Sequence, residues 1–495
     1  MEYNNDKNFI VELILPLMGL SEEEINSISE TINYISMPIS PSNSGEKTNP
    51  FSLEEKGKRI RVKLIEMTGE PVELTIEFTN VIDEESFNLF ECLFRSYCLY
   101  GKDSSGKYIQ NALINEKVNE LILQKGLFSY VLGDKFCKNF KIDDLFKCLQ
   151  RWSEKTYEGH NVCYGFLINT NAPKEKIPTH IDKASFGNFI DFIGEEYSAV
   201  FTDGITSIVE INGDCDFVKY HSILHDRKPL PDNLENVKLP IRFADVVYEN
   251  VVEGKVGLFL LTNGDIIFAQ KQAISFVRRG GRWLNFSHKA FYDTISSYVC
   301  EKAISKEIIQ AIYCSCLDIS FAHSGGLVAV IDESNKEWIE DLKKVNPIVT
   351  KLDTLNEHDF DYIYETLGKI YSEEKEKIDK KSSKKSIKDN LLKDLNKRLT
   401  KKRYLLQILK DNTYFPKIDR KLRADLSGLD GAIILNTSGN VIACGAIIAN
   451  KAGSSGGGRG SAARTLSKYG GFAIKISTDG YIEAFVDESR IYSIK

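Results

Sequence analysis

The sequence has ten cysteines but no CxxC pair, the spacing that zinc sites and thiol redox sites reuse. It also lacks an HExxH motif, and its glycine-rich loop does not end in Lys-Ser or Lys-Thr. The sequence therefore contains neither the zinc-peptidase motif nor a P-loop. We expect the cysteines to be reduced thiols, as is usual in the cytosol.

Long apolar runs and an excess of one charge are also missing. No run approaches the roughly 18 apolar residues that a membrane-spanning helix needs, since the stretch 9–20 is short and carries Glu12. The first residues lack the positive region of a secretory signal. Lys and Arg total 64 against 70 Asp and Glu, a net charge of −6, which gives no general attraction to nucleic acid or anionic lipid. We expect a soluble cytoplasmic protein with neither a membrane nor a nucleic-acid partner.

The chain has enough apolar residues for more than one core. Its 495 residues, 42% of them hydrophobic, indicate two to four domains. We predict an N-terminal α+β module at residues 1–155 and a β-rich α+β module at 156–298. An α/β domain with a mixed sheet is predicted at 299–495, interrupted by a charged helical insertion at about 333–423.

The N-terminal patterns predict that the chain begins with helices and continues with a hairpin. Ser21 and Glu24 have the spacing of a capping box, and isoleucines recur at helical spacing over 25–35. Residues 38–58 are rich in Pro, Ser, Asn and Gly, which is typical of a loop. Alternating apolar residues over 60–78, around a Thr-Gly-Glu-Pro turn, predict a β-hairpin.

The middle of the chain has strand-and-turn patterns. Asp-Gly, Asn-Gly-Asp and Asn-Gly-Asp turns at 203–204, 212–214 and 263–265 separate apolar runs and predict tight turns with positive φ. The basic and aromatic cluster 278–283 could contact a phosphate and a base. We favour a solvated turn with Trp283 packed under it, because isolated basic turns are common on surfaces.

Residues 302–313 have a helical pattern, and the alternation over 317–321 then predicts extended chain. The continuous apolar run 327–331 predicts a strand buried on both faces. The insertion 333–423 has apolar residues four apart with lysines between them, which predicts an amphipathic helix or a helical hairpin. Acidic residues interleave with the lysines over 369–402, so a solvated face is favoured over a nucleic-acid arm.

The C-terminal segment carries the most informative motifs. An Asp-Gly-Ala strand over 430–435 and a return strand over 441–449 predict a hairpin. The loop 452–461 is rich in glycine, contains Arg459, and precedes a helix predicted at 462–469. Backbone N–H groups at such a helix N-terminus favour an anion, and the arginine can add a charge-assisted hydrogen bond.

Two more strands are predicted at 472–477 and 481–486. The succession of Asp-Gly-Ala strand, return strand, glycine-rich loop with arginine, helix starting Ala-Ala, and strand ending at Ser477 resembles the diadenylate cyclase domain. That family joins two ATP molecules into cyclic di-AMP. The run 325–330 is similar to the family's first core strand, so the resemblance covers about 300–490.

The resemblance implies roles for individual residues. Asp430 would bind Mg²⁺ or Mn²⁺ and help to activate the attacking 3′-hydroxyl, if ATP is bound or cyclised. Arg459 and the two alanines Ala462 and Ala463 match the family's phosphate motif, and Ser477 would meet terminal phosphates. The nucleotide-binding set that the resemblance implies is Gly431, Ala432, Gly456, Gly457, Gly458, Arg459, Gly460, Ser461, Ser477 and His323.

The chain departs from the cyclase motif at three positions. Gly458, Gly460 and Ser461 stand where the family has Thr, His and a second Arg. Losing one donor at developing phosphate charge lowers the rate about 10²- to 10³-fold. Binding is affected less than catalysis, because the backbone N–H groups at the helix N-terminus remain. The chain is also similar to predicted nucleotide-sensor relatives of this fold, in its His-x-Gly-Gly strand at 323–326 and its Gly-Gly-Gly-Arg loop at 456–459.

We therefore predict a sensor or signalling protein that binds an adenine nucleotide or cyclic dinucleotide. One alternative is an active diadenylate cyclase. A second is a non-binding structural or assembly protein, in which Asp430 is a turn residue before a strand and His323 is a packing residue. Two protomers face each other in the family, so a homodimer or higher homo-oligomer is expected if catalysis is retained and is optional for a sensor.

Overall fold

The computed structural model divides into two units. Unit 1 comprises Met1–Leu230 and Phe243–Ser287, and unit 2 comprises Pro231–Arg242 and His288–Lys495. Helices accompany sheets with both parallel and antiparallel pairs, so the chain is of mixed α/β class, as predicted. The residues described are 14, 17, 25–32, 51–56, 59–65, 71–78, 84–100, 116–133, 140–173, 188–223, 239–286, 288–299, 304–332, 334, 360–381, 385–409, 414–448 and 457–494.

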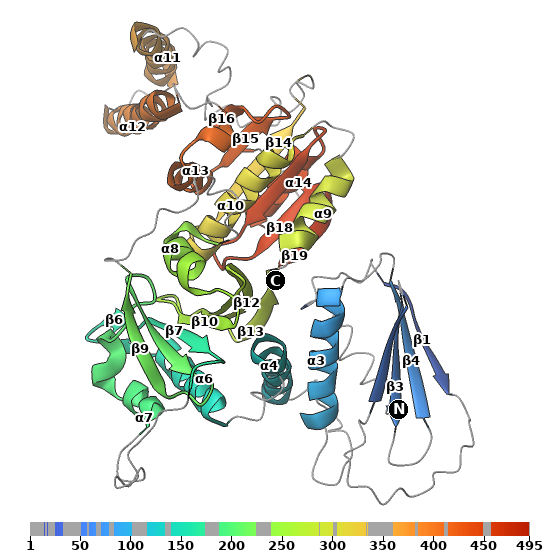
Figure 1. The fold of residues 1–495 in the computed structure, drawn as a ribbon. Helices are drawn as coiled ribbons and strands as arrows, with labels where there is room; N and C mark the ends of the chain where they lie inside the picture. Colours follow the sequence, from blue (N-terminus) through green and yellow to red (C-terminus); the bar gives the residue numbers. More distant parts are fainter. Residues whose placement is uncertain are drawn as a thin grey trace, which may run out of the picture. The chain divides into compact units, whose positions relative to one another are not determined.

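An antiparallel sheet begins the described chain, with strand order β1-β4-β3-β2 (Figure 1). The antiparallel pairing of the hairpin predicted over 60–78 is confirmed, because β3 pairs with β4, while residues 66–70 between them lie outside the described residues. Residues 51–56, which were expected within a loop, are a strand instead, because they pair in register with β3. The strands are β1 Ile25–Ile32, β2 Phe51–Lys56, β3 Arg59–Ile65 and β4 Pro71–Phe78.

The helix predicted over 25–35 is wrong for residues 25–32, which form strand β1. Strand β1 pairs with β4, placing Ile28 opposite Ile76 and Ile32 opposite Val72. Eight residues with apolar side chains three and four apart fit either structure, and pairing with a distant strand decides between them. The capping box at Ser21 and Glu24 lies outside the described residues.

Within the described part of unit 1, a second sheet has the strand order β13-β12-β11-β10-β7-β8-β9, in which only β7 and β8 are parallel. Its strands are β7 Tyr164–Asn169, β8 Ser207–Asn212, β9 Phe217–Ser222, β10 Lys255–Leu260, β11 Ile266–Gln270, β12 Ala273–Arg279 and β13 Arg282–Asn285. The helices in this part of the chain are α3 Glu84–Tyr100, α4 Glu116–Leu132, α6 Phe140–Ser153, α7 Phe189–Gly194, the 3₁₀ helix η5 Glu196–Val200 and α8 Ile241–Asn250. A short hairpin joins β5 Thr156–Tyr157 to β6 His160–Asn161.

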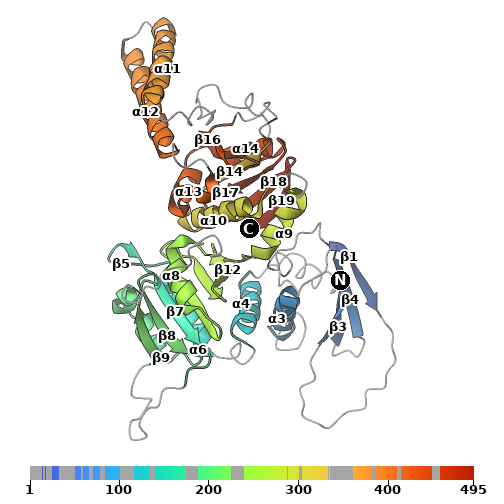
Figure 2. The same ribbon diagram turned by 45° about the horizontal axis from the view of Figure 1, so that its top comes forward.

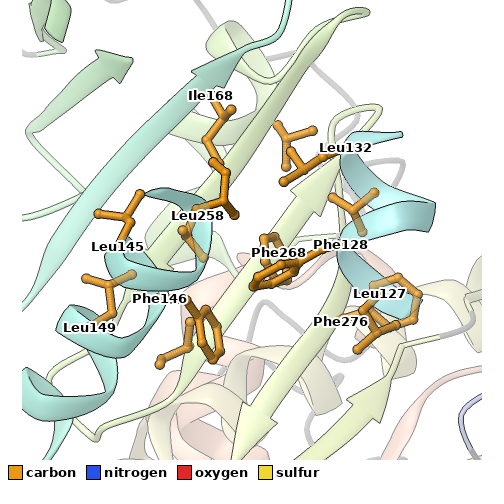
Figure 3. Close-up of a cluster of buried hydrophobic side chains, with 14 of the residues drawn as sticks. Leu127, Phe128, Leu132, Leu145, Phe146, Leu149, Ile168, Leu258, Phe268 and Phe276 are labelled. Carbon is orange, nitrogen blue, oxygen red and sulfur yellow. The ribbon is translucent and has the colours of Figure 1, made fainter. Parts of the chain in front are cut away.

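The core of unit 1 is built from aromatic rings. Phe128 and Phe146, on α4 and α6, have ring centroids 5.4 Å apart, and the Phe268 ring lies 5.7 Å from that of Phe128 (Figure 3). Trp283 stacks on Phe146 at 5.5 Å. The predicted boundary near residue 155 falls between α6 and β5, and this core joins elements on both sides of it.

The positive φ predicted at the tight turns of unit 1 is confirmed for 203–204 and 263–265, where Gly204 and Gly264 have φ of +67° and +85°. In the remaining turn the left-handed residue is Cys215, one residue after the predicted 212–214. In the basic cluster, Trp283 is buried as expected. Two of the cluster's three arginines are ion-paired, however: Arg278 Nη2 is 2.5 Å from Glu120 and Arg279 Nε is 2.8 Å from Asp265, while Arg282 is exposed.

Unit 2 has, in its described residues, a mixed sheet with strand order β16-β15-β14-β17-β18-β19. Every residue of β14 is buried, which confirms the predicted buried strand, and β15 and β16 form the predicted antiparallel hairpin. Helix α14 packs on one face of the sheet, and α10 and α13 cover the other (Figure 2). The strands are β14 Gly326–Ile331, β15 Ala432–Asn436, β16 Val441–Ala446, β17 Phe472–Ile476, β18 Ile482–Val486 and β19 Ser489–Ile494, and the helices are α9 His288–Val299, α10 Lys306–Ala322, α13 Arg420–Ser427 and α14 Gly457–Ser467.

The alternation over 317–321 does not mark extended chain, because helix α10 continues to Ala322. Ser305 caps the helix by accepting the N–H of Ile308, and residues 311–321 are all buried. A helix buried on every side shows no polar stripe, so its periodicity cannot be recognised in the sequence.

The predicted helical hairpin is confirmed within the insertion. Helix α11, Phe360–Lys381, pairs with α12, Lys385–Leu409, and a 3₁₀ helix η10, Phe415–Lys417, follows. Exposed ion pairs such as Lys377–Glu374, at 2.7 Å, fit the predicted solvated face. In the part of the chain that the structure describes, no helix is both long and apolar enough to cross a membrane.

Candidate functional site at one edge of the sheet

The candidate site lies at one end of the strands of the sheet in unit 2, which we call the edge of that sheet. Strands β14 and β15 are parallel, with Val328 opposite Ile433, so both begin at this edge. Strand β17 is antiparallel to β14, with Gly326 opposite Ile476, so it ends there. The segments before β14 and β15 and the segment after β17 therefore meet at the same edge. The candidate residues on these segments are His323, Asp430 and Ser477.

Arg459 brings helix α14 to this edge. A Cβ atom built on Gly325 would lie 2.6 Å from Nη1 and 3.3 Å from Cζ of Arg459, so the guanidinium rests against that glycine. The same Cβ would be 3.3 Å from Cγ2 of Thr478, in the turn after β17. Gly325 has φ +65°, in the region that favours glycine. Three segments far apart in the sequence thus converge on Gly325, and a side chain there would displace the arginine.

Helix α14 begins at Gly457, five residues before the predicted start at Ala462, so the described part of the glycine-rich segment is helical and not a loop. Gly460 and Ser461 are buried, and packing on β14 and β17 offsets the roughly 1 kcal/mol that each interior glycine costs a helix. Gly456 lies outside the described residues. Arg459, in the first turn of α14, contacts Gly325, so the start of α14 lies at this edge. The first N–H groups of a helix have no partner within the helix and attract anions.

The His-Ser-Gly-Gly turn ends helix α10. His323 adopts the left-handed conformation with φ +51°, and its N–H donates to the carbonyls of Ile319 and Ser320. The backbone of His323 is therefore a helix cap, while its side chain is half-buried and that of Ser324 is exposed. The turn presents two polar side chains at the edge that carries Arg459.

A second cation, which the sequence prediction missed, lies under the start of α14. Nζ of Lys475 would be 3.9 Å from a Cβ built on Gly460. Lys475 pairs with Glu483 at 2.7 Å, and Arg490 pairs with the other oxygen of that carboxylate at 3.1 Å. The signal for this residue was a single lysine in an otherwise apolar strand, which indicates no ligand until the facing helix is known.

Asp430 is exposed at the same edge, immediately before β15. Among the described residues, no three or more His, Cys, Asp or Glu side chains are grouped so that they could hold a metal ion. A single carboxylate still fits Mg²⁺ or Mn²⁺ bound together with a nucleotide, because such ions are often held by one or two carboxylates and the substrate's phosphates. Asp430 would supply the protein ligand in that arrangement.

Gly431 and Ala432, which the resemblance places against the nucleotide, also have packing roles. Gly431 has φ +100°, and a Cβ there would lie 2.5 Å from the carbonyl carbon of Gly445 in the neighbouring strand. Ala432 is buried in the core beneath α14, together with Ala462 and Ala463. Close packing of the hairpin and helix therefore accounts for these small residues without a ligand.

Ser477 stabilises the turn between β17 and β18. Its Oγ accepts the N–H of Tyr481 at 3.1 Å, and its own N–H donates to the Tyr481 carbonyl at 2.9 Å. The hydroxyl proton can still donate to a ligand. Arg464, the nearest other arginine in sequence, lies in the last turn of α14 with its guanidinium 5.6 Å from the Phe485 ring, so it does not take the place of the family's second arginine.

Together these residues define an α/β domain whose sheet edge combines a helix N-terminus, an arginine held against a glycine turn, and an exposed carboxylate. Comparisons of the chain with protein-family models, with curated proteins and with solved structures found no match.

Proposed function

We propose that unit 2 binds a phosphorylated ligand, an adenine nucleotide or a cyclic dinucleotide, and that the protein is a sensor of that ligand. The observation that carries the proposal is the position of Arg459, whose guanidinium lies against Gly325 at the start of α14. A positive side chain and the free amides of a helix N-terminus are thereby brought to one place. Their combination favours a phosphate group.

The surrounding residues support a ligand larger than a single phosphate. His323, Ser324 and Thr478 lie on the turns that meet Arg459, and their side chains can donate hydrogen bonds. The resemblance to the diadenylate cyclase domain supports adenine as the base. The glycines at 457 and 458 are exposed, so a ligand can approach the backbone there.

The same residues argue for binding over cyclisation. The family's histidine and second arginine correspond to Gly460 and Ser461, which are both buried in the first turns of α14. Lys475 lies close to Gly460, but its ammonium is paired with Glu483. Of the two cations that the described residues bring to the start of α14, only Arg459 is not held by Glu483. One cation can bind phosphate while lacking most of the charge stabilisation that phosphoryl transfer needs.

The test is to incubate the purified chain with ATP and Mn²⁺ or Mg²⁺ and to separate the nucleotides by chromatography, with Asp430→Asn as the control. In parallel, binding of ATP and of cyclic di-AMP is measured by calorimetry. We expect saturable binding of at least one ligand and no product. Cyclic di-AMP made by the wild type but not by Asp430→Asn would establish the cyclase instead.

Two arginine variants give a matched comparison. Arg459→Ala should weaken binding, whereas Arg464→Ala, on the same helix and with the same change of charge, should leave it nearly unchanged because Arg464 lies at the other end of α14. Equal effects of the two variants, or no binding of either ligand by the wild type, would contradict the proposal.

A further inference from the structure

Strand β9 is the last strand of its sheet among those the structure describes in unit 1. It pairs with β8 from Ser207 opposite Ser222 to Ile211 opposite Phe217, and its residues 217–220 are exposed. The outward N–H and C=O groups of an edge strand can pair with another extended chain. Natural edge strands are usually covered or protected by charge. In β9 the exposed residues are Lys219 and three apolar residues, Phe217, Val218 and Tyr220, so most of this exposed edge is apolar.

Aromatic side chains surround this edge. A bulge in the pairing of β8 with β9 puts Phe217 and Tyr220 on the same face as α7. The Phe217 ring lies 5.6 Å from Phe189, and the Tyr220 ring lies 5.7 Å from Phe201. Phe192 lies 5.1 Å from Phe201, so the rings form one connected surface.

Large apolar side chains on this surface are exposed to an unusual degree. Tyr197 is 60% exposed and its ring contacts Phe192 at 5.5 Å, while Val200 is 75% exposed. Phe217 and Tyr220 are 44% and 43% exposed. An aromatic patch of this kind, beside an open strand edge, is typical of a protein interaction site. We call these four residues, Tyr197, Val200, Phe217 and Tyr220, the β9 patch.

Among the described residues, the exposed charged side chains on α7 and η5 beside the β9 patch are acidic, whereas the exposed Lys219 of β9 pairs with Glu210 and lies on the other face of the strand from Tyr220. The sequence contains no Lys, Arg or His from residue 184 to residue 218, but it contains Asp and Glu throughout that stretch. Asp191 on α7, Glu195 between α7 and η5, and Glu196 on η5 are exposed, next to the aromatic rings. A basic partner is attracted to such a rim, whereas an acidic partner is repelled.

We propose that the β9 patch binds an extended, basic polypeptide segment of another protein, which adds a strand to the β9 edge. Main-chain hydrogen bonds to β9 would give affinity, apolar side chains of the segment would cover the rings, and flanking Lys or Arg would meet the acidic rim. This goes beyond ligand binding by unit 2, since it assigns a partner surface to unit 1.

A second copy of the chain fits this surface less well. Two copies that met patch to patch would bring the carboxylates of Asp191, Glu195 and Glu196 of each rim together, and such like-charge contacts are unfavourable. The charge of the rim therefore selects a basic segment over self-association.

The test uses the full chain and a fluorescein-labelled peptide of sequence Lys-Lys-Val-Thr-Val-Lys-Lys, followed by fluorescence anisotropy. A peptide with Glu in place of each Lys, and a peptide methylated at alternate backbone nitrogens, are the comparison probes. We expect saturable binding of the lysine peptide below about 1 mM, the weak end of specific affinities. The glutamate peptide and the methylated peptide should bind at least about tenfold more weakly.

Variants place the binding on the surface. Phe217→Ser should weaken binding of the lysine peptide at least about tenfold, as loss of an aromatic anchor does. Val252→Ser is the matched control, because Val252 is also 43% exposed in unit 1 but is not part of the patch. The double change Glu195→Lys and Glu196→Lys should reverse the preference between the lysine and glutamate peptides.

Several outcomes would overturn the proposal. These are no saturation with the lysine peptide, equal affinity for the glutamate or methylated peptide, or an equal effect of Val252→Ser and Phe217→Ser. Sedimentation of the wild type and Phe217→Ser gives a further check. If the wild type self-associates and the variant does not, then the β9 patch joins copies of this chain and does not bind a separate basic segment.

Discussion

Replacing Gly325 with alanine, together with a control for backbone strain, should show whether ligand binding depends on the position of Arg459 and not only on the stability of the fold. The new Cβ would lie 2.6 Å from Nη1 of Arg459, too close for the guanidinium to stay where it is. Gly325 also has φ +65°, where a non-glycine residue costs about 1–2 kcal/mol. The variant should therefore lose about 1–2 kcal/mol of folding free energy and also lose the arginine from the proposed phosphate site.

The loss of binding can be worked out from the contact that is displaced. A hydrogen bond to a charged group contributes about 1.5–3 kcal/mol, which corresponds to roughly ten- to 150-fold in Kd. Gly325→Ala should therefore weaken binding of ATP or cyclic di-AMP by about as much as Arg459→Ala. Calorimetry measures the affinity, and urea unfolding measures the stability of the same preparations.

Gly280→Ala is the control for backbone strain. Gly280 has φ +55°, and a Cβ there would have nothing within 4 Å, so the variant has a similar strain without displacing a neighbour. It should lose stability to a similar extent and retain full affinity. If Gly325→Ala binds the ligand as tightly as the wild type, the reasoning about Arg459 is refuted.

Two further predictions concern buried charges. Arg420 and Asp318 form a buried ion pair, with Nε of the arginine 2.8 Å from Oδ2 of the aspartate. Arg420→Ala should therefore lower the free energy of unfolding, measured in urea, by about 3–5 kcal/mol. The double variant Arg420→Met with Asp318→Leu should lower it less, because no charge is left unpaired, and a larger loss in the double variant would contradict this. Burial alone raises the pKa of Glu210, but hydrogen bonds from Asn169 and His221 outweigh it and leave the pKa below its usual value. The stabilising effect of the carboxylate should thus be present above the unfolded pKa of about 4.3 and be lost as the pH falls through the lower native pKa. Unfolding of the wild type and Glu210→Gln should differ at pH 7 and converge in acid, and a constant difference would show that the charge is not responsible.

The elements that could be predicted from the sequence are those whose signals lie in neighbouring residues. The hairpin over 60–78 and the hairpin of β15 with β16 each have a turn motif between two apolar strands. Strand β14 was recognised from five consecutive apolar residues, and the hairpin of α11 and α12 from apolar side chains four apart. These patterns depend on local backbone preference, so no distant contact was needed to interpret them.

The wrong predictions share a dependence on distant partners. Residues 25–32 have side chains that suit a helix or a strand, and they are a strand because β4 is present to pair with them. Residues 317–321 alternate, yet they are helical because α10 is buried on all sides. The glycine-rich segment from 457 is helical because it packs on β14 and β17.

The candidate site shows the same division. The sequence by itself determined which residues are available: an arginine after glycines, a His-Ser-Gly-Gly turn, and an aspartate before a strand. Only the tertiary structure decided that Arg459 rests against Gly325 and that Lys475 lies under Gly460, because strand order and helix packing bring these residues together. The contact between Gly325 and Arg459 cannot be predicted from the residues around either position. It follows from the register of β14 with β17 and from the direction in which α14 crosses them.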